Sequence, residues 1–167
     1  EFRRVLFRSY PKFVLNEAEA YTTDTMHRVF IHDGVNKKAF VASYYNSLSF
    51  AFAEILGRNF GGGCLELMPS EVEDIYLPYD EENEDLFDRI DYMLRHGATA
   101  DDILDVTDEI ILHQRMHLSR KEVALARSIW HKIMGRRLNR ETLEKKKDEK
   151  NPEQKQKYLI LLHNDYL

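Results

Sequence analysis

Apolar and polar residues alternate near the start of the chain, and this pattern predicts β-structure. The alternation runs from Lys12 to Val35 and is enriched in β-branched and aromatic residues. Period-two alternation is typical of a strand with one buried face. We therefore predict two strands, Lys12–Thr22 and His27–His32, followed by an Asp33-Gly34 turn.

A helical period replaces this alternation after residue 40. Apolar residues recur at spacings of three and four, as on one buried face of a single long helix, at Val41, Tyr44, Tyr45, Leu48, Phe52, Ile55 and Leu56. Gly57 marks the predicted end of this helix. After the Gly61–Gly63 loop we predict a strand, Cys64–Leu67, and one helical turn that begins at Glu71 after a Ser70–Glu73 capping box.

The second half of the sequence has helical patterns. Helices are predicted over Glu84–Arg95, over Ala100–Leu112 after a Thr99 cap, and over Arg120–Leu138 after a Ser119–Glu122 capping box. One face of the last helix carries Val123, Ala126, Ile129, Trp130, Ile133 and Met134. The predicted fold class is α+β: a small mixed β region with a long buried helix over residues 10–79, followed by a helical segment over residues 80–140. Residues 141–167 form a charged tail with no assigned role.

The first nine residues differ in character from the rest of the chain. The chain opens Glu1-Phe2-Arg3-Arg4 without an initiator Met, so residues 1–9 resemble translated linker or adapter sequence and are left out of the fold prediction. The alternative is a genuine basic arm that binds phosphate. Because the sequence starts abruptly at Tyr10, we expect the natural N-terminus to lie upstream.

Composition is that of a soluble globular protein, with 43% apolar and 32% charged residues. No apolar run approaches the ~20 residues of a membrane span, so we expect a cytoplasmic protein without membrane contact. A single cysteine, Cys64, excludes an internal disulfide. His113 and His117 lack the intervening Glu of a zinc-binding H-E-x-x-H motif, so no metal site is predicted. No nucleophile stands beside a base in the sequence, so no catalytic residue is predicted.

Charge is unevenly distributed around the net value of −5. The stretch Asp80–Glu109 is acidic, whereas Arg115–Lys150 is basic. A polyanion is therefore expected to meet the basic stretch or the glycine-rich loop.

Two segments carry groups suited to DNA. Three consecutive glycines, Gly61–Gly63, permit positive φ or the close approach of another backbone; a DNA backbone contact, a plain flexible loop and a phosphate cradle all remain open. The segment Thr22–Arg28 combines hydroxyls, a carboxylate, an imidazole and a guanidinium that suit base edges and phosphates. The alternative is that these side chains close a turn by bonding to the backbone.

The block Asn46–Glu73, NSLSFAFAEILGRNFGGGCLELMPSEVE, resembles a characteristic block near the C-terminus of Eco57I-like and related N6-adenine DNA methyltransferases. Tyr21–Arg28 is similar to the segment before that block, and Ile75–Tyr79 to its Leu-Pro-hydrophobic close. The resemblance covers Pro11 to Pro78 and continues more weakly to Arg140.

This resemblance implies the target-recognition part of a SAM-dependent DNA adenine-N6 methyltransferase of a restriction-modification system. In that family a separate catalytic domain binds S-adenosylmethionine and holds the flipped adenine with an Asn/Asp-Pro-Pro-Tyr/Phe motif. This sequence contains neither that motif nor the glycine-rich motif that binds S-adenosylmethionine. We therefore expect that this fragment binds no cofactor, and that its partners are double-stranded DNA and a catalytic domain, upstream on the same chain or on a separate subunit. The resemblance places near DNA Thr23, Asp24, Thr25, His27, Arg28, Asn46, Ser47, Arg58, Gly61, Gly62, Gly63 and Ser70.

Three further functions fit the same sequence. A non-catalytic protein-interaction module would use Tyr44, Tyr45, Phe50 and Phe52 to cap a partner surface. The chain could also be a stand-alone specificity subunit or a complete small enzyme, such as a nuclease subunit. DNA binding is distinguished by its steep dependence on salt, and an enzyme by turnover.

Overall fold

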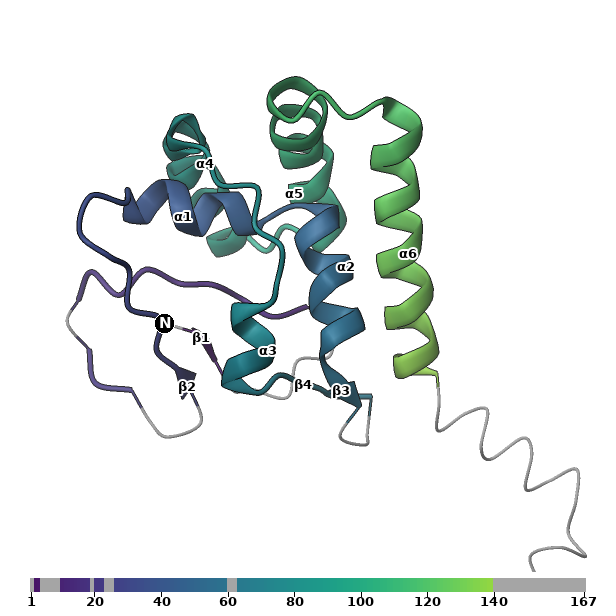
Figure 1. The fold of residues 1–167 in the computed structure, drawn as a ribbon, viewed down its shortest axis with the longest axis horizontal. Coiled ribbons are helices and arrows are strands. Elements are labelled where there is room, and N and C mark those ends of the chain that lie inside the picture. The colour runs from purple at the N-terminus through teal and green to yellow at the C-terminus, as the bar shows by residue number, and fades with distance from the viewer. Residues whose placement is uncertain (1, 4–9, 19, 23–25, 60–62, 140–167) are drawn as a thin grey trace, which may run out of the picture.

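The structure is a computed structural model that describes residues 2–3, 10–18, 20–22, 26–59 and 63–139. Its elements in chain order are β1 (Phe2–Arg3), β2 (Met26–His27), α1 (Lys37–Tyr44), α2 (Ser47–Leu56), β3 (Arg58–Asn59), β4 (Leu65–Glu66), α3 (Pro69–Glu73), the 3-10 turn η1 (Glu81–Asn83), α4 (Glu84–Arg95), α5 (Ala100–Thr107), the π-helical segment η2 (Asp108–Arg115) and α6 (Arg120–Leu138). Helices dominate, with two short antiparallel strand pairs, which confirms the α+β class (Figure 1).

The β-structure is much smaller than predicted. The Lys12–Thr22 strand is wrong, and the second predicted strand is reduced to β2, which pairs with β1. Two of the residues set aside as linker-like therefore take part in the fold. Aromatic packing explains the failed prediction: Tyr10 and Phe13 are buried by helices, since Tyr10 stacks on Phe50 with ring centroids 4.9 Å apart.

The single long helix is also wrong, because the chain turns at Tyr45 and Asn46 and forms two helices, α1 and α2. Asn46 has extended backbone angles, and its side-chain oxygen accepts from the N–H of Ser49, which starts α2. The predicted end at Gly57 is confirmed. The apolar spacing persists across the break because residues from both helices face one core.

The later helices follow the sequence closely. The bounds of α4 and α6 are those predicted, and Ser119 and Glu122 form the expected capping box. The predicted Ala100–Leu112 helix begins as expected but changes to π-helical geometry at Asp108. α3 begins at Pro69, before the predicted start, because the Glu71 carboxylate accepts from the N–H of Met68, 2.7 Å away.

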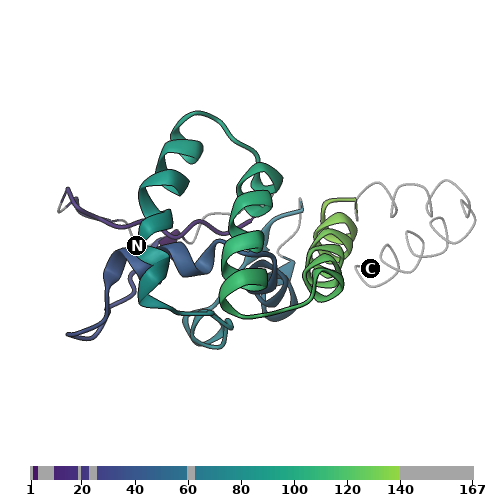
Figure 2. The same ribbon diagram turned by 90° about the horizontal axis from the view of Figure 1, so that it is seen from above.

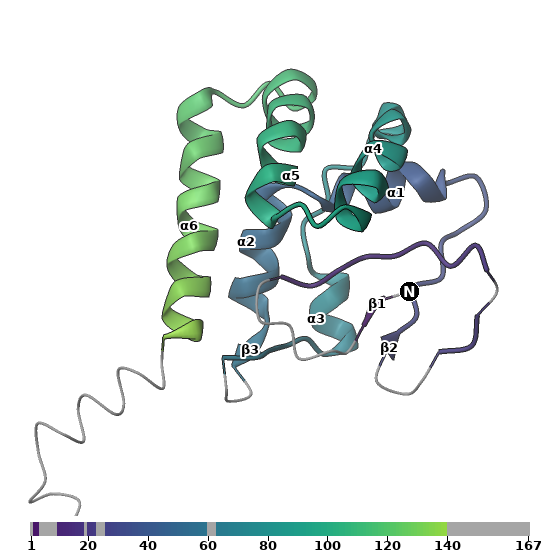
Figure 3. The same cartoon turned by 180° about the vertical axis from the view of Figure 1, so that it is seen from behind.

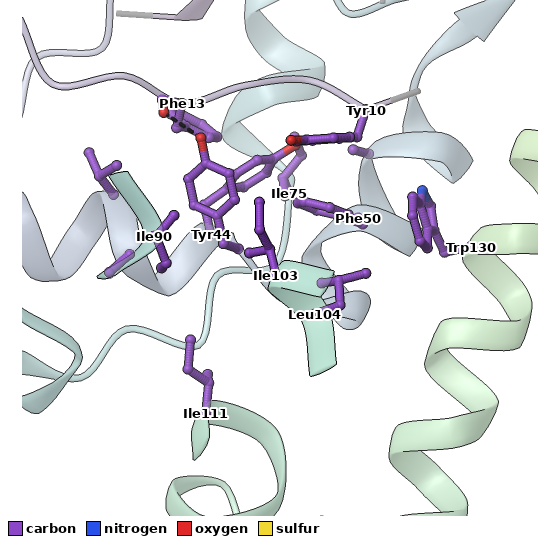
Figure 4. Close-up of a cluster of buried hydrophobic side chains, with 14 of the residues drawn as sticks. Tyr10, Phe13, Tyr44, Phe50, Ile75, Ile90, Ile103, Leu104, Ile111 and Trp130 are labelled. Carbon is purple, nitrogen blue, oxygen red and sulfur yellow. Dashed lines mark hydrogen bonds between the residues drawn. The ribbon is translucent and has the colours of Figure 1, made fainter. Parts of the chain in front are cut away.

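One hydrophobic core joins the two halves of the described chain. Figure 4 shows the aromatic residues of the first half against aliphatic residues of α5 and η2. Trp130 closes one end, with its ring centroid 5.4 Å from that of Phe50. α1 packs on α4, and α2 packs on α6, which lies at one side of the molecule in Figure 2. None of the described helices combines the length and apolarity required to cross a membrane.

Candidate nucleic-acid interface

One edge of the molecule collects several of the predicted site residues. β2, the β3–β4 hairpin and the C-terminal end of α6 lie along the lower edge of Figures 1 and 3, with α3 just above them. These elements bring together His27, Arg28, Arg58 and Ser70. The acidic helix α4 lies at the upper part of both views. Five further predicted residues lie outside the described residues: Thr23, Asp24, Thr25, Gly61 and Gly62.

His27 and Arg28 have different roles at this edge. The imidazole Nε2 of His27 lies 2.8 Å from the carbonyl oxygen of Leu67, so it ties β2 to the residue that follows β4. The side chain of Arg28 is exposed and forms no hydrogen bond or ion pair in the part of the chain that the structure describes. Arg28 therefore presents an unpaired guanidinium to solvent.

Arg58 is already held by a carboxylate. Its Nε donates to Oε1 of Glu71 over 2.8 Å, and 67% of its side chain is exposed. Because the other oxygen of Glu71 accepts from Met68, this carboxylate joins the hairpin to the start of α3. Ser70 is exposed beside it. Arg58 can bind a phosphate only with donors that Glu71 leaves free, so we expect a weaker contribution from it than from Arg28.

Asn46 and Ser47 are structural residues in the interior, which sequence reasoning could not distinguish from contacts to DNA. Both are fully buried, and the Asn46 amide donates to the carbonyl oxygen of Ser43 and to Oγ of Ser49. The backbone N–H and Oγ of Ser47 donate to the two oxygens of Asp108 over 2.7 and 2.5 Å. Their polar groups are thus committed to α2, and we withdraw both from the proposed DNA contacts.

Asp108 is the buried centre of a polar cluster between α2, η2 and α6. Burial raises the pKa of the Asp108 carboxyl, although hydrogen bonds from Ser47 and the nearby charge of Arg127 oppose this rise. Nη2 of Arg127 lies 3.0 Å from the Asp108 carboxylate, and its Nη1 donates to Asp105. The cluster fixes the start of α2 relative to α6, because every charge in it has a partner.

Gly63 lies directly against the end of α6. Its φ is 71°, and a Cβ atom built there would lie 3.3 Å from the Cα of Leu138. Its carbonyl oxygen accepts from Nη1 of Arg137 over 2.5 Å. Gly63 is buried, so its role in this structure is close packing against α6, and we withdraw it from the proposed DNA contacts.

A buried ion pair anchors the end of α6. Nε and Nη2 of Arg137 donate to the two oxygens of Glu54 over 2.9 and 2.5 Å, in bidentate geometry. The two side chains are only 4% and 1% exposed. Sequence reasoning missed this pair, although one signal was present: Glu54 is the only charged residue of α2.

The basic stretch after residue 115 is less available to a polyanion than its composition indicates. Four of its cations form ion pairs within the chain: Arg115, Arg120, Arg127 and Arg137. Among the described residues, Lys121, Lys132 and Arg136 are exposed and have no such pair. Arg136 lies in the last turn of α6, next to the hairpin, and so adds a cation to the edge that carries Arg28.

Most of this edge lies within a region that matches a known protein family. Residues 2–112 match the family described as type II methyltransferase M.Eco57I, C-terminal domain, which is more than half of the chain. The match includes every predicted site residue and ends within η2, before α6. No curated protein and no solved structure gives a significant match. The chain therefore belongs to the family of the C-terminal domain of the type II methyltransferase M.Eco57I.

Proposed function

We propose that this chain is the DNA-binding, target-recognition part of a SAM-dependent DNA adenine-N6 methyltransferase of the restriction-modification type. The catalytic domain lies upstream on the same chain or on a separate subunit. The observation that carries the proposal is the unpaired guanidinium of Arg28 on the exposed edge of a methyltransferase-family domain. A free, exposed cation gains from a phosphate or a guanine edge without first breaking an internal bond.

The distribution of charge supports one orientation on DNA. Arg28, Arg58 and Arg136 lie at the edge formed by β2, the β3–β4 hairpin and the end of α6, although Glu66 and, beside it on α3, Glu71, Glu73 and Asp74 also lie there. The carboxylates of η1 and α4 gather away from it, at Glu81, Glu82, Glu84, Asp85, Asp88 and Asp91. Phosphates attract the first group and repel the second. The duplex therefore approaches the edge with the strands, despite the net negative charge of the chain.

The burial of the aromatic residues does not support a protein-interaction module that uses them to cap a partner surface. Tyr44, Tyr45 and Phe50 are at most 1% exposed, so they cannot cap a partner surface. Phe52 is partly covered by Tyr76, with ring centroids 5.8 Å apart. These rings stabilise the core of this chain.

We propose that the S-adenosylmethionine used by the parent enzyme binds to the catalytic domain and not to this chain. The cavity next to Arg28, of about 710 Å³, has mostly apolar walls and contributes one carboxylate, Glu73. S-Adenosylmethionine carries a sulfonium, an ammonium group and a carboxylate, and so has a net positive charge. Arg28 would pair with the carboxylate, which leaves Glu73 alone to face both cationic groups, so this lining does not favour the cofactor.

Fluorescence anisotropy with a labelled duplex tests DNA binding by the full chain. The affinity is expected to fall steeply with salt, because each phosphate contact releases counterions. Arg28→Ala should weaken binding by ~1–3 kcal/mol if the side chain reads a base, or reduce the salt slope by about one if it binds a phosphate. Arg58→Ala should have a smaller effect, since Glu71 already holds its Nε.

Arg95→Ala is the matched control. This arginine is also exposed, but it lies on acidic α4 and pairs with Asp91 over 2.6 Å. Its loss should leave DNA affinity unchanged. Salt-independent binding, or equal affinities for Arg28→Ala and the unchanged chain, would contradict the proposal.

A further inference from the structure

We propose that the cavity between the segment His27–Phe30 and α3 binds one unstacked nucleotide of a distorted DNA duplex. This inference rests on the proposed function and assigns a ligand to one part of the same edge. The cavity has a volume of about 710 Å³, within the ~300–1,000 Å³ typical of small-molecule sites. We call it the β2–α3 cavity.

Aromatic rings form the walls of the β2–α3 cavity. Phe13 and Phe40 meet edge to face with ring centroids 6.3 Å apart, and Phe13 is also packed on Tyr44. These two rings are therefore fixed by the core. Phe30 lines the same cavity but is 85% exposed. A base that stacks on Phe30 would cover a large apolar surface that folding leaves in water.

The polar groups of the cavity suit a nucleotide better than an apolar side chain. Arg28 lines the cavity with an exposed, unpaired guanidinium, which can bind the phosphate of the nucleotide. Glu73, at the end of α3, contributes a carboxylate that can accept from an N–H of the base. An aliphatic side chain of a protein partner would use the rings but gain nothing from Arg28.

Adenine methylation would leave one nucleotide of the duplex unpaired, and this nucleotide could enter the β2–α3 cavity. Chemistry at the amino group of adenine requires that the base leave the stack. The base opposite then has no partner, and it can also leave the stack at little further cost. With the adenine held by the catalytic domain, the β2–α3 cavity would hold this second base and keep the duplex open.

Binding to short labelled duplexes tests the inference on the full chain. One duplex is fully paired, a second carries a single bulged thymidine, and a third carries an abasic bulge at the same place. We expect roughly tenfold tighter binding to the thymidine bulge than to the abasic bulge, as one aromatic stacking contact predicts. Phe30→Ala should abolish this preference and retain the affinity for the paired duplex, because Phe30 is hardly involved in the core.

Tyr92→Ala is the control for loss of an exposed ring. Tyr92 is 63% exposed on α4, away from the cavity, and the variant should keep the preference for the thymidine bulge. The fluorescence of buried Trp130 verifies that each variant is folded.

Each remaining outcome overturns the inference. If the chain binds the paired duplex in a salt-dependent way but does not prefer the thymidine bulge, the inference fails while the proposed function stands. A preference that survives in Phe30→Ala also refutes the cavity as its cause. If the chain does not prefer the thymidine bulge, and Phe30→Ala instead weakens binding of the chain to the separate catalytic domain, then the cavity binds a protein partner. Absence of binding to every duplex refutes both proposals.

Discussion

Replacing Arg137 by methionine is expected to destabilise the fold strongly. The guanidinium donates to both oxygens of Glu54 and to the carbonyl oxygen of Gly63. The Glu54 side chain is 1% exposed. After the replacement this carboxylate would remain in the interior without its cation, since methionine fills the space of the stem but donates no hydrogen bond.

The expected loss in the free energy of unfolding is ~3–5 kcal/mol, the usual cost of removing one partner of a buried ion pair. The bidentate geometry and the near-complete burial of both side chains place this pair in that class, and not among exposed pairs. Domains are commonly stable by only ~5–15 kcal/mol, so this loss would remove from roughly a fifth to nearly all of the stability. It would unfold at a much lower denaturant concentration.

Urea denaturation followed by tryptophan fluorescence measures this loss. Trp130 is the single tryptophan of the chain, is 1% exposed, and lies on α6 together with Arg137. Linear extrapolation of the transition gives the free energy of unfolding in water. Arg136→Met is the control, because this neighbouring side chain is exposed and its loss should change stability by no more than about 0.5 kcal/mol.

The double variant Glu54→Leu/Arg137→Met separates the charge from the packing. When both charges are removed, no carboxylate is left unpaired, so most of the lost stability should return. A loss below about 1 kcal/mol in Arg137→Met, the size expected of a solvent-exposed pair, would refute the reasoning. So would a double variant that is as unstable as the single one.

Two further predictions concern α6. Gly63→Ala should lower stability in urea denaturation more than Gly34→Ala: both residues have positive φ, 71° and 90°, but only at Gly63 would the new Cβ press on the α6 backbone. Equal losses would contradict this contact. Hydrogen bonds from Ser119 hold the pKa of Glu122 below its ordinary value, so Ser119→Ala should raise that pKa in an NMR titration. A depressed folded pKa stabilises the fold above the ordinary pKa of Glu122, and the contribution disappears as the pH falls through the folded pKa. A pKa that does not move would show that Ser119 is not its cause.

Features that depend on a few neighbouring residues could be predicted from the sequence. The bounds of α4 and α6 are correct, and so is the capping box of Ser119 and Glu122. Each capping hydrogen bond joins residues three apart, and the apolar spacing of a helix is set within a few turns. The block that identified the family is likewise a local pattern, and the match over residues 2–112 confirms that resemblance.

Periodicity could not show what covers an apolar residue. Phe13 lies in the stretch that was predicted to be a strand, yet Tyr44 of α1 packs on it, and Tyr10 just before that stretch stacks on Phe50 of α2. The spacing from Val41 to Leu56 continues through the break at Asn46, because both helices face the same core. A period indicates which side of a segment is buried, and a strand or a helix can satisfy that requirement in several ways.

The accessible residues of the candidate interface were decided by tertiary structure alone. Ser47 bonds to Asp108, 61 positions away, and Glu54 pairs with Arg137, 83 positions away. These contacts use the polar groups of Ser47 and Arg137 to stabilise the interior, so they are not available to DNA. Arg28, in contrast, is exposed and unpaired within the described residues. Residue identity by itself determines which groups can bind a phosphate or a base. Whether such a group is desolvated and already paired depends on neighbours that only the folded chain brings together.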